Sequence, residues 1–213
     1  YISLLGSRSL DTRWSVEVLA AILSKQGRHQ EAKRLLNQLI AVMEAGGISD
    51  DSPVMGWTRY QLANVLVEVE DWSEADKEFR LARISLGTER AFRKSYLLQS
   101  SPALTLLRTG QSKDALRLLQ KAREAAEQNY GADHYKTLEI YGLLAVALLD
   151  TGNTSRAFDL FSGTVPSLLE NRAVGAQQKK LVLESYLNLL ARIRGTSIER
   201  RAGVDTVAEA FRI

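Results

Sequence analysis

Apolar positions recur at helical spacing along most of the chain, most clearly in the stretch 130–161. A first helix is marked by Leu138, Tyr141, Leu144, Ala145 and Leu148. Gly152 and Asn153 interrupt the pattern, and both residues tolerate the left-handed backbone that a helix end needs. Beyond them, Thr154 or Ser155 can cap a second helix, whose apolar stripe is Ala157, Leu160 and Phe161. The stretch therefore predicts a helix, a tight turn and a second helix.

The same arrangement occurs four times, at a spacing of 40 to 43 residues. A small residue near the start of each second helix defines the register: Ala32, Ala75, Ala115 and Ala157. Twelve residues earlier stands another alanine, followed three residues later by a leucine: Ala20 and Leu23, Ala63 and Leu66, Ala103 and Leu106, Ala145 and Leu148. The turns carry Gly27, Gly110 and Gly152, with Glu70 in the remaining copy.

Two short helices cannot bury their apolar faces alone, so the copies are expected to stack on one another. The alanines let paired helices cross closely, and a larger residue in each second helix fills the seam: Leu36, Phe79, Leu119 and Phe161. The pattern predicts an all-α fold, a right-handed α-solenoid of antiparallel helix pairs.

The expected helices can be placed along the chain. They are Trp14–Ser24, Glu31–Glu44, Trp57–Val69, Ser73–Leu86, Thr88–Gln99, Ser112–Gln128, Gln177–Arg192 and Val204–Ile213, beside the pair in 130–161. Ser52 and Pro53 form a favourable helix start, and Ser112 is the expected cap of its helix. Because Pro102 precedes Ala103, the helix there either starts afresh near Ser100 or kinks. Gly195–Arg200 is expected to be a loop.

Composition limits the class of protein. The 213 residues include three prolines and no cysteine, which excludes disulfides and a cysteine nucleophile within this sequence. No run of 18 apolar residues predicts a transmembrane helix, and no leader is visible. Since the sequence starts at Tyr1 without a methionine, we expect it to be a piece of a longer protein. The compartment stays open, with the cytoplasm favoured.

Charge is concentrated at the C-terminal end. From Asn171 on, eight Lys and Arg residues stand against four acidic residues, a net charge of +4, whereas the rest of the chain carries −1. Such an excess can attract an acidic partner or nucleic acid. The alternative, which we favour, is a solvated surface or one matched to a further domain, because no aromatic residues that could stack on bases are interleaved with the charges.

Neither catalysis nor metal binding is predicted. The two histidines, His29 and His134, lie in different copies, at a turn and before a helix, and His134 is expected to order its loop. Acidic clusters such as Asp50-Asp51 fall at helix ends or on polar faces, where solvated side chains are the ordinary case. No strand and no glycine-rich phosphate loop is evident, so no cofactor is expected.

The repeated pattern resembles the tetratricopeptide repeat. The spacing of about 42 residues, with the motif Tyr130-Gly131-Ala132-Asp133-His134 followed by Thr137-Leu138, is similar to the kinesin-light-chain type. The resemblance covers roughly Trp14 to Phe161. Together with the apolar pattern, it predicts a lead-in over residues 1–13, four helix pairs over 14–170, and C-terminal helices over 171–213 that cap the array or lead to a further domain. It implies a non-catalytic scaffold that binds a peptide, a partner helix or another domain of its own protein.

A second resemblance concerns the C-terminal end. The segment AGVDTVAEAFRI is similar to one found between the repeats and the caspase-like CHAT domain of bacterial multidomain proteins. It implies that the chain is the regulatory arm of such a protease. Three hypotheses therefore compete: a peptide-binding scaffold, a CHAT-protease arm, and a nucleic-acid-binding protein that uses its basic end.

The inner, concave face of such a repeat array is formed by first helices and is the expected partner-binding surface. Helical spacing assigns to it Trp57, Tyr60, Asn64, Glu68, Leu97, Arg108, Glu139, Gly142 and Val146. Trp57 and the equivalent Trp14 either line this face or belong to the core. Gly142 leaves room for a ligand side chain or for a neighbouring backbone. We expect Tyr60, Asn64 and Arg108 to be partly exposed, so that a peptide would meet a ring, an amide and a cation.

Overall fold

The structure is a computed structural model that describes residues 10–213, with side chains from Arg13 onward. Every regular element in that range is an α-helix, so the predicted all-α fold is confirmed. The chain divides into two compact units, Tyr1–Ser95 and Tyr96–Ile213, and the boundary falls inside α5 (Arg90–Leu98). The predicted lead-in over 1–13 lies largely outside the described residues. Its last residues, from Leu10 on, belong to α1.

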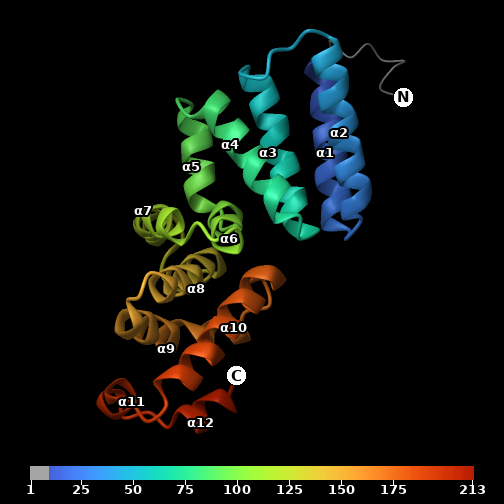
Figure 1. Cartoon of the computed structure of the whole chain (residues 1–213). Helices are drawn as coiled ribbons and strands as arrows, with labels where there is room; N and C mark the ends of the chain where they lie inside the picture. The colour runs from blue at the N-terminus through green and yellow to red at the C-terminus, as the bar shows by residue number, and fades with distance from the viewer. Residues whose placement is uncertain (1–9) are drawn as a thin grey trace. The chain divides into compact units, whose positions relative to one another are not determined.

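The first unit contains two helix pairs. They are α1 (Leu10–Lys25) with α2 (His29–Ala45), and α3 (Pro53–Glu68) with α4 (Trp72–Leu86). Figure 1 shows these helices lying side by side, and α2 packs against both α1 and α3. Ser52 caps α3 as predicted, since its hydroxyl accepts a hydrogen bond from the Met55 amide at 3.2 Å.

The second unit continues the arrangement. It contains α6 (Ser101–Arg108), α7 (Ser112–Tyr130), α8 (Tyr135–Asp150), α9 (Thr154–Glu170), α10 (Ala176–Ile193), α11 (Ser197–Ala202) and α12 (Thr206–Ala210). Helices α8 and α9 form the pair that defined the sequence pattern. Helix α10 packs on both of them, so it takes the place of a further first helix.

The alanines that set the register lie where the pattern put them. All eight are buried: Ala20, Ala32, Ala63, Ala75, Ala103, Ala115, Ala145 and Ala157. The larger seam residues, such as Leu36 and Phe161, are buried as well. The internal register read from the sequence is therefore confirmed.

The turn inside each copy has one geometry. Gly27, Gly110 and Gly152 have φ between +75° and +87°, and Glu70 takes the same left-handed conformation with φ +58°. The next residue donates its amide hydrogen back to the repeat leucine five residues earlier, as in Asn153 to the Leu148 carbonyl at 2.8 Å. The same bond joins Arg28 to Leu23, Asp71 to Leu66 and Gln111 to Leu106.

This turn corrects the predicted caps of two second helices. The N-cap residues are Gln111 and Asn153, not Ser112, Thr154 or Ser155, and neither makes a side-chain cap hydrogen bond. The residue whose amide bonds back to the first helix is also the N-cap of the second helix, with ψ near 50° instead of the extended backbone of Ser52. Compactness of the turn therefore replaces side-chain capping.

Prolines act differently at two places. In the third copy the helix starts afresh, since α5 ends at Leu98 and α6 begins at Ser101 with Pro102 in its first turn. In contrast, α9 continues through Pro166 to Glu170. At the C-terminal end the predicted loop Gly195–Arg200 is wrong in part, because Thr196 caps the short helix α11.

Candidate interaction surfaces

One repeat position in the first helices, occupied by Tyr60 in the second copy, contacts the next first helix in every copy. Glu17 of α1 accepts a hydrogen bond from Thr58 of α3 at 2.7 Å. Tyr60 meets Ser95 of α5, with the two oxygens 3.5 Å apart. Ser100, just before α6, donates to Glu139 of α8 at 2.6 Å. A Cβ added at Gly142 of α8 would lie 2.7 Å from Val182 of α10.

The prediction that Tyr60 is partly exposed is therefore wrong. Its side chain is only 3% exposed, and its ring packs edge-on against Phe92 and at a tilt against Phe79. Burial raises the pKa of the Tyr60 hydroxyl above its ordinary value. Helical spacing assigned Tyr60 to the accessible face, but it lies on the side of α3 that contacts α5.

The predicted residues of α8 are covered within the second unit. Glu139 is buried and accepts hydrogen bonds from the Ser100 hydroxyl and, at 2.8 Å, from the Gly175 amide. Gln178 of α10 donates to the same Ser100 hydroxyl at 2.9 Å, which completes a buried polar network. Val146 is buried too, and the room predicted beside Gly142 is filled by Val182 and Leu168.

Three predicted residues of α3 remain accessible. Glu68 is exposed, and Trp57 and Asn64 are half-buried. Their spacing of seven and four residues puts them on one stripe of the helix, which we call the α3 stripe (Trp57, Asn64 and Glu68). The Trp57 ring stands edge-on to Tyr60 at 5.9 Å and to Phe92 at 5.7 Å between centroids.

The two remaining predicted residues belong to the second unit. Leu97 is half-buried near the end of α5. Arg108 is half-buried near the end of α6, and its guanidinium lies 3.9 Å from the Glu184 carboxylate of α10. Arg108 belongs to the second compact unit and Tyr60 to the first.

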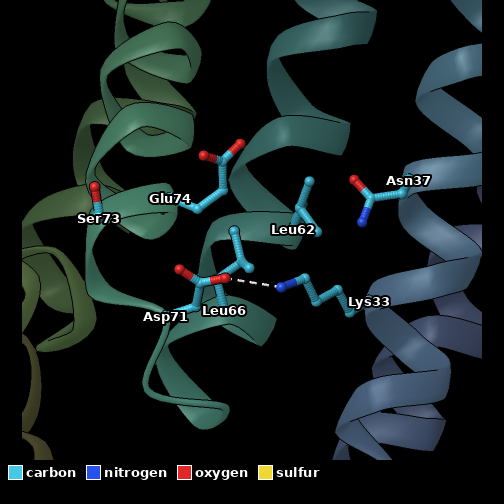
Figure 2. Close-up of a pocket in the computed structure, with 7 residues that line it drawn as sticks. All are labelled: Lys33, Asn37, Leu62, Leu66, Asp71, Ser73 and Glu74. Atoms are coloured by element: carbon cyan, nitrogen blue, oxygen red, sulfur yellow. Dashed lines mark hydrogen bonds and ion pairs between the residues drawn. The ribbon is translucent and has the colours of Figure 1, made fainter.

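A polar cleft of about 470 Å³ lies over α3 in the first unit. Figure 2 shows Leu62 and Leu66 of α3 between side chains of α2 and α4. Lys33 and Asp71 form an ion pair at 2.8 Å across it. The ion pair joins α2 to the start of α4, so it links the first and second copies.

The loop before α8 carries the residues of the kinesin-light-chain-like motif. The imidazole of His134 stacks on Tyr130 at 4.7 Å between ring centroids, and its Nδ1 accepts the Lys136 amide at 3.3 Å. His134 is also the N-cap of α8, so it orders the loop as predicted. Within residues 10–213, no group of three or more His, Asp or Glu side chains is placed to hold a metal ion. Over the same range, no helix combines the length and apolarity that crossing a membrane requires.

An exposed apolar stripe on α1 was not predicted from the sequence. Trp14, Val18, Leu19 and Ile22 are between 37% and 64% exposed. Only Trp14 was considered there, because the others follow the apolar spacing expected of a packed face.

Comparisons with known proteins agree with this architecture. Models of the tetratricopeptide repeat match residues 100–162 and 14–38. A crystal structure of the nearly identical TPR-like repeats of a protein described as a kinesin light chain from Podosopora anserina is similar. It has a TM-score of 0.57 at 23% identity, covering 84% of each chain. A single-residue variant of those repeats gives a TM-score of 0.61 at 21% identity, covering 92% of this chain and 91% of that one. Among curated proteins, none matches the chain.

The fold and the repeated turn define a helical-repeat protein built from antiparallel helix pairs. The two family-model matches show that the chain contains tetratricopeptide repeats, at residues 14–38 and 100–162. Repeats of this family generally mediate protein–protein interaction, and their fold is typically a non-catalytic scaffold.

Proposed function

We propose that this chain is a non-catalytic scaffold that binds a peptide or a partner helix on the first-helix side of its repeats. The observation that carries the proposal is the α3 stripe, where an aromatic ring, an amide and a carboxylate lie along one accessible line of a helix. Tyr60, Glu139, Gly142 and Val146 are left out because neighbouring helices cover them.

The chemistry of the α3 stripe suits an extended or helical peptide. The Trp57 ring is supported edge-on by two aromatic neighbours, so little conformational entropy is lost when a partner packs on it. Asn64 donates to the Tyr60 carbonyl at 2.8 Å, and an amide group offers a peptide both a donor and an acceptor. The exposed Glu68 favours a basic residue in the partner. We therefore expect a segment with one apolar anchor and a nearby Lys or Arg.

Selection from a displayed random-peptide library tests the proposal without a known partner. Peptides enriched on the chain should carry an apolar anchor and a basic residue. Their affinity should fall at least about tenfold in Trp57→Ala and in Glu68→Lys, because the anchor contact or the charge attraction is lost. Circular dichroism must first show that each variant keeps its helix content.

The matched control is Glu124→Lys, which makes the same charge reversal at an exposed position of α7. It should leave peptide affinity unchanged. Enriched peptides that bind Trp57→Ala and Glu68→Lys as tightly as the parent chain would contradict the proposal, because the binding surface would then lie elsewhere.

The two other hypotheses stay predictions. Binding of nucleic acid by the basic end predicts an affinity for DNA or RNA that falls steeply as salt rises, and no binding at low salt would remove it. A CHAT-protease arm predicts a His and a Cys in sequence beyond Ile213. Neither hypothesis depends on the α3 stripe, so both can be tested separately from it.

A further inference from the structure

The Trp57 ring of the α3 stripe is held by a residue of the following copy. Phe92 of α5 is buried, and its ring stands nearly perpendicular to Trp57 with the centroids 5.7 Å apart. Phe92 also packs edge-on against Tyr60 at 5.3 Å, and Tyr60 in turn meets Trp57 at 5.9 Å. The three rings therefore contact one another in every pair, and only Phe92 comes from outside α3.

The two rings that support Trp57 differ in what their contacts require. Tyr60 follows Trp57 by three residues on the same helix, so this contact forms whenever α3 forms. Phe92 is distant in sequence, so its contact forms only when α5 is docked on α3. The orientation of Trp57 therefore depends on a helix that contributes no residue to the α3 stripe.

The order of α5 depends in turn on this docking. The helix has nine residues, and isolated helices shorter than about 12–15 residues are marginal in water. Its contacts with α3 include the Phe92 ring and the approach of the Ser95 hydroxyl to that of Tyr60 at 3.5 Å. Docking of α5 and ordering of Trp57 thus share the same ring contacts, and a coupling between two such events acts in both directions.

We propose that Phe92 is a positioning residue of the α3 stripe, and that docking of α5 regulates the affinity of this stripe for its peptide. With Phe92 in place, Trp57 already has the orientation in which a partner packs on it. Without Phe92, the partner has to immobilise the Trp57 side chain on binding, which weakens the complex. The inference rests on the proposed function, because it concerns the same surface.

The first test needs no ligand and uses the indole N–H signal of Trp57 in an NMR spectrum of the full chain. The signal is identified as the one that Trp57→Ala lacks. Phe92→Leu keeps an apolar side chain but removes the ring, so the signal should shift and its relaxation should show a more mobile indole. The matched control is Phe79→Leu. Phe79 is also 2% exposed and contacts Tyr60 at 5.9 Å, but among the described residues no ring contact joins it to Trp57.

The second test uses a peptide enriched from the library on the α3 stripe. Its affinity should fall about two- to tenfold in Phe92→Leu and stay unchanged in Phe79→Leu, since only the first variant frees Trp57. Bound peptide should also slow hydrogen exchange of the α5 amides in the parent chain, and this effect should vanish in Phe92→Leu. Melting curves must show that both variants are folded at the assay temperature.

The proposal is overturned if Trp57 is as ordered in Phe92→Leu as in the parent chain. It is also overturned if enriched peptides lose affinity in Trp57→Ala but bind Phe92→Leu and the parent chain equally. Peptides that bind Trp57→Ala as tightly as the parent chain contradict the proposed function itself, and the regulation of affinity falls with it. The NMR result then still decides whether Phe92 positions Trp57, so the two failures are distinguishable.

Discussion

At the scale of single residues, Glu70 stands out because it adopts a conformation that glycine adopts in the other three copies. Its φ of +58° is the only positive value among the described residues that are not glycine. A Cβ in the left-handed region costs about 1–2 kcal/mol, whereas glycine avoids this cost but loses more backbone entropy on folding. The turn geometry is thus kept in the second copy against a local penalty.

Glu70→Gly should therefore raise the free energy of unfolding by about 0.5–1 kcal/mol, measured by urea denaturation. Gly152→Ala at the equivalent position, with φ +87°, is the matched control and should lower it by a similar amount. A Glu70→Gly variant that is less stable than the parent chain would show that the Glu70 side chain contributes more than its backbone costs.

Arg59 is the second residue with an unusual setting. Its guanidinium is nearly buried and binds three carboxylates: Glu78 at 3.0 Å, Asp50 at 2.6 Å and Glu44 at 3.2 Å. Glu78 is buried as well, and burial raises the pKa of its carboxyl despite the opposing hydrogen bond from Arg59. The cluster ties α3 to α4, to the end of α2 and to the loop that follows α2.

Arg59→Met should lower the free energy of unfolding by about 3–5 kcal/mol at neutral pH, because it leaves the charged Glu78 buried without its partner. The raised pKa of Glu78 in the folded state means that folding favours the protonated carboxyl. Glu78 therefore stabilises the fold at pH values below its ordinary pKa. This stabilisation is lost as the pH rises through the raised pKa of the folded state. Removing Arg59 raises that folded pKa further. The difference in free energy of unfolding between Arg59→Met and the parent chain should therefore shrink as the pH falls from 7 toward the range in which carboxyl groups become protonated.

Urea denaturation at several pH values measures this dependence. The double variant Arg59→Met/Glu78→Leu is the control, and it should recover much of the lost stability at pH 7, since no buried charge remains. A deficit that stays constant with pH would mean that lost packing of the Arg59 side chain dominates.

At the scale of helices, close approach depends on which glycines face a neighbour. A Cβ on Gly142 would meet Val182 of α10 at 2.7 Å, whereas a Cβ on Gly163 of α9 would meet nothing within 4 Å. Both glycines lie inside helices, where alanine is intrinsically favoured. Replacing each of these two glycines by alanine therefore distinguishes the effect of helix propensity on stability from the effect of packing.

Gly142→Ala should lower the free energy of unfolding by about 1–3 kcal/mol through overpacking, while Gly163→Ala should raise it by about 0.5–1 kcal/mol. Thermal melts of the two variants, followed by circular dichroism at 222 nm, check the opposite signs. If Gly142→Ala were as stable as Gly163→Ala, α10 would not be held closely against α8.

At the scale of the whole molecule, stability should be local along the chain. Helix contacts join mainly sequence neighbours, as expected of a repeat array, and the chain divides at residue 95 into two compact units. Hydrogen–deuterium exchange should show that Arg59→Met weakens protection in α2, α3 and α4 much more than in α8 and α9. Gly142→Ala should give the reverse pattern. Equal loss of protection throughout the chain in either variant would indicate one cooperative unit.

The sequence alone predicted the fold because its signals are short-range and repeated. Alanines at a constant spacing mark where helices cross, and Gly152 or Ser52 marks where a helix ends or begins. Each signal acts within about twelve residues, and four copies in register make the spacing hard to mistake. The local effect of Pro102 predicted either a restart of the helix near Ser100 or a kink, and the structure has the restart.

The tertiary structure decided which side of each first helix is available. Helical spacing groups Tyr60 with Trp57, and it groups Glu139 with Gly142, but it does not say which neighbour covers them. Burial depends on residues distant in sequence: Phe92 over Tyr60, Gly175 and Ser100 around Glu139, and Val182 beside Gly142. The same periodicity that predicts a packed face on α3 leaves Leu19 and Ile22 exposed on α1, because no preceding second helix lies among the described residues.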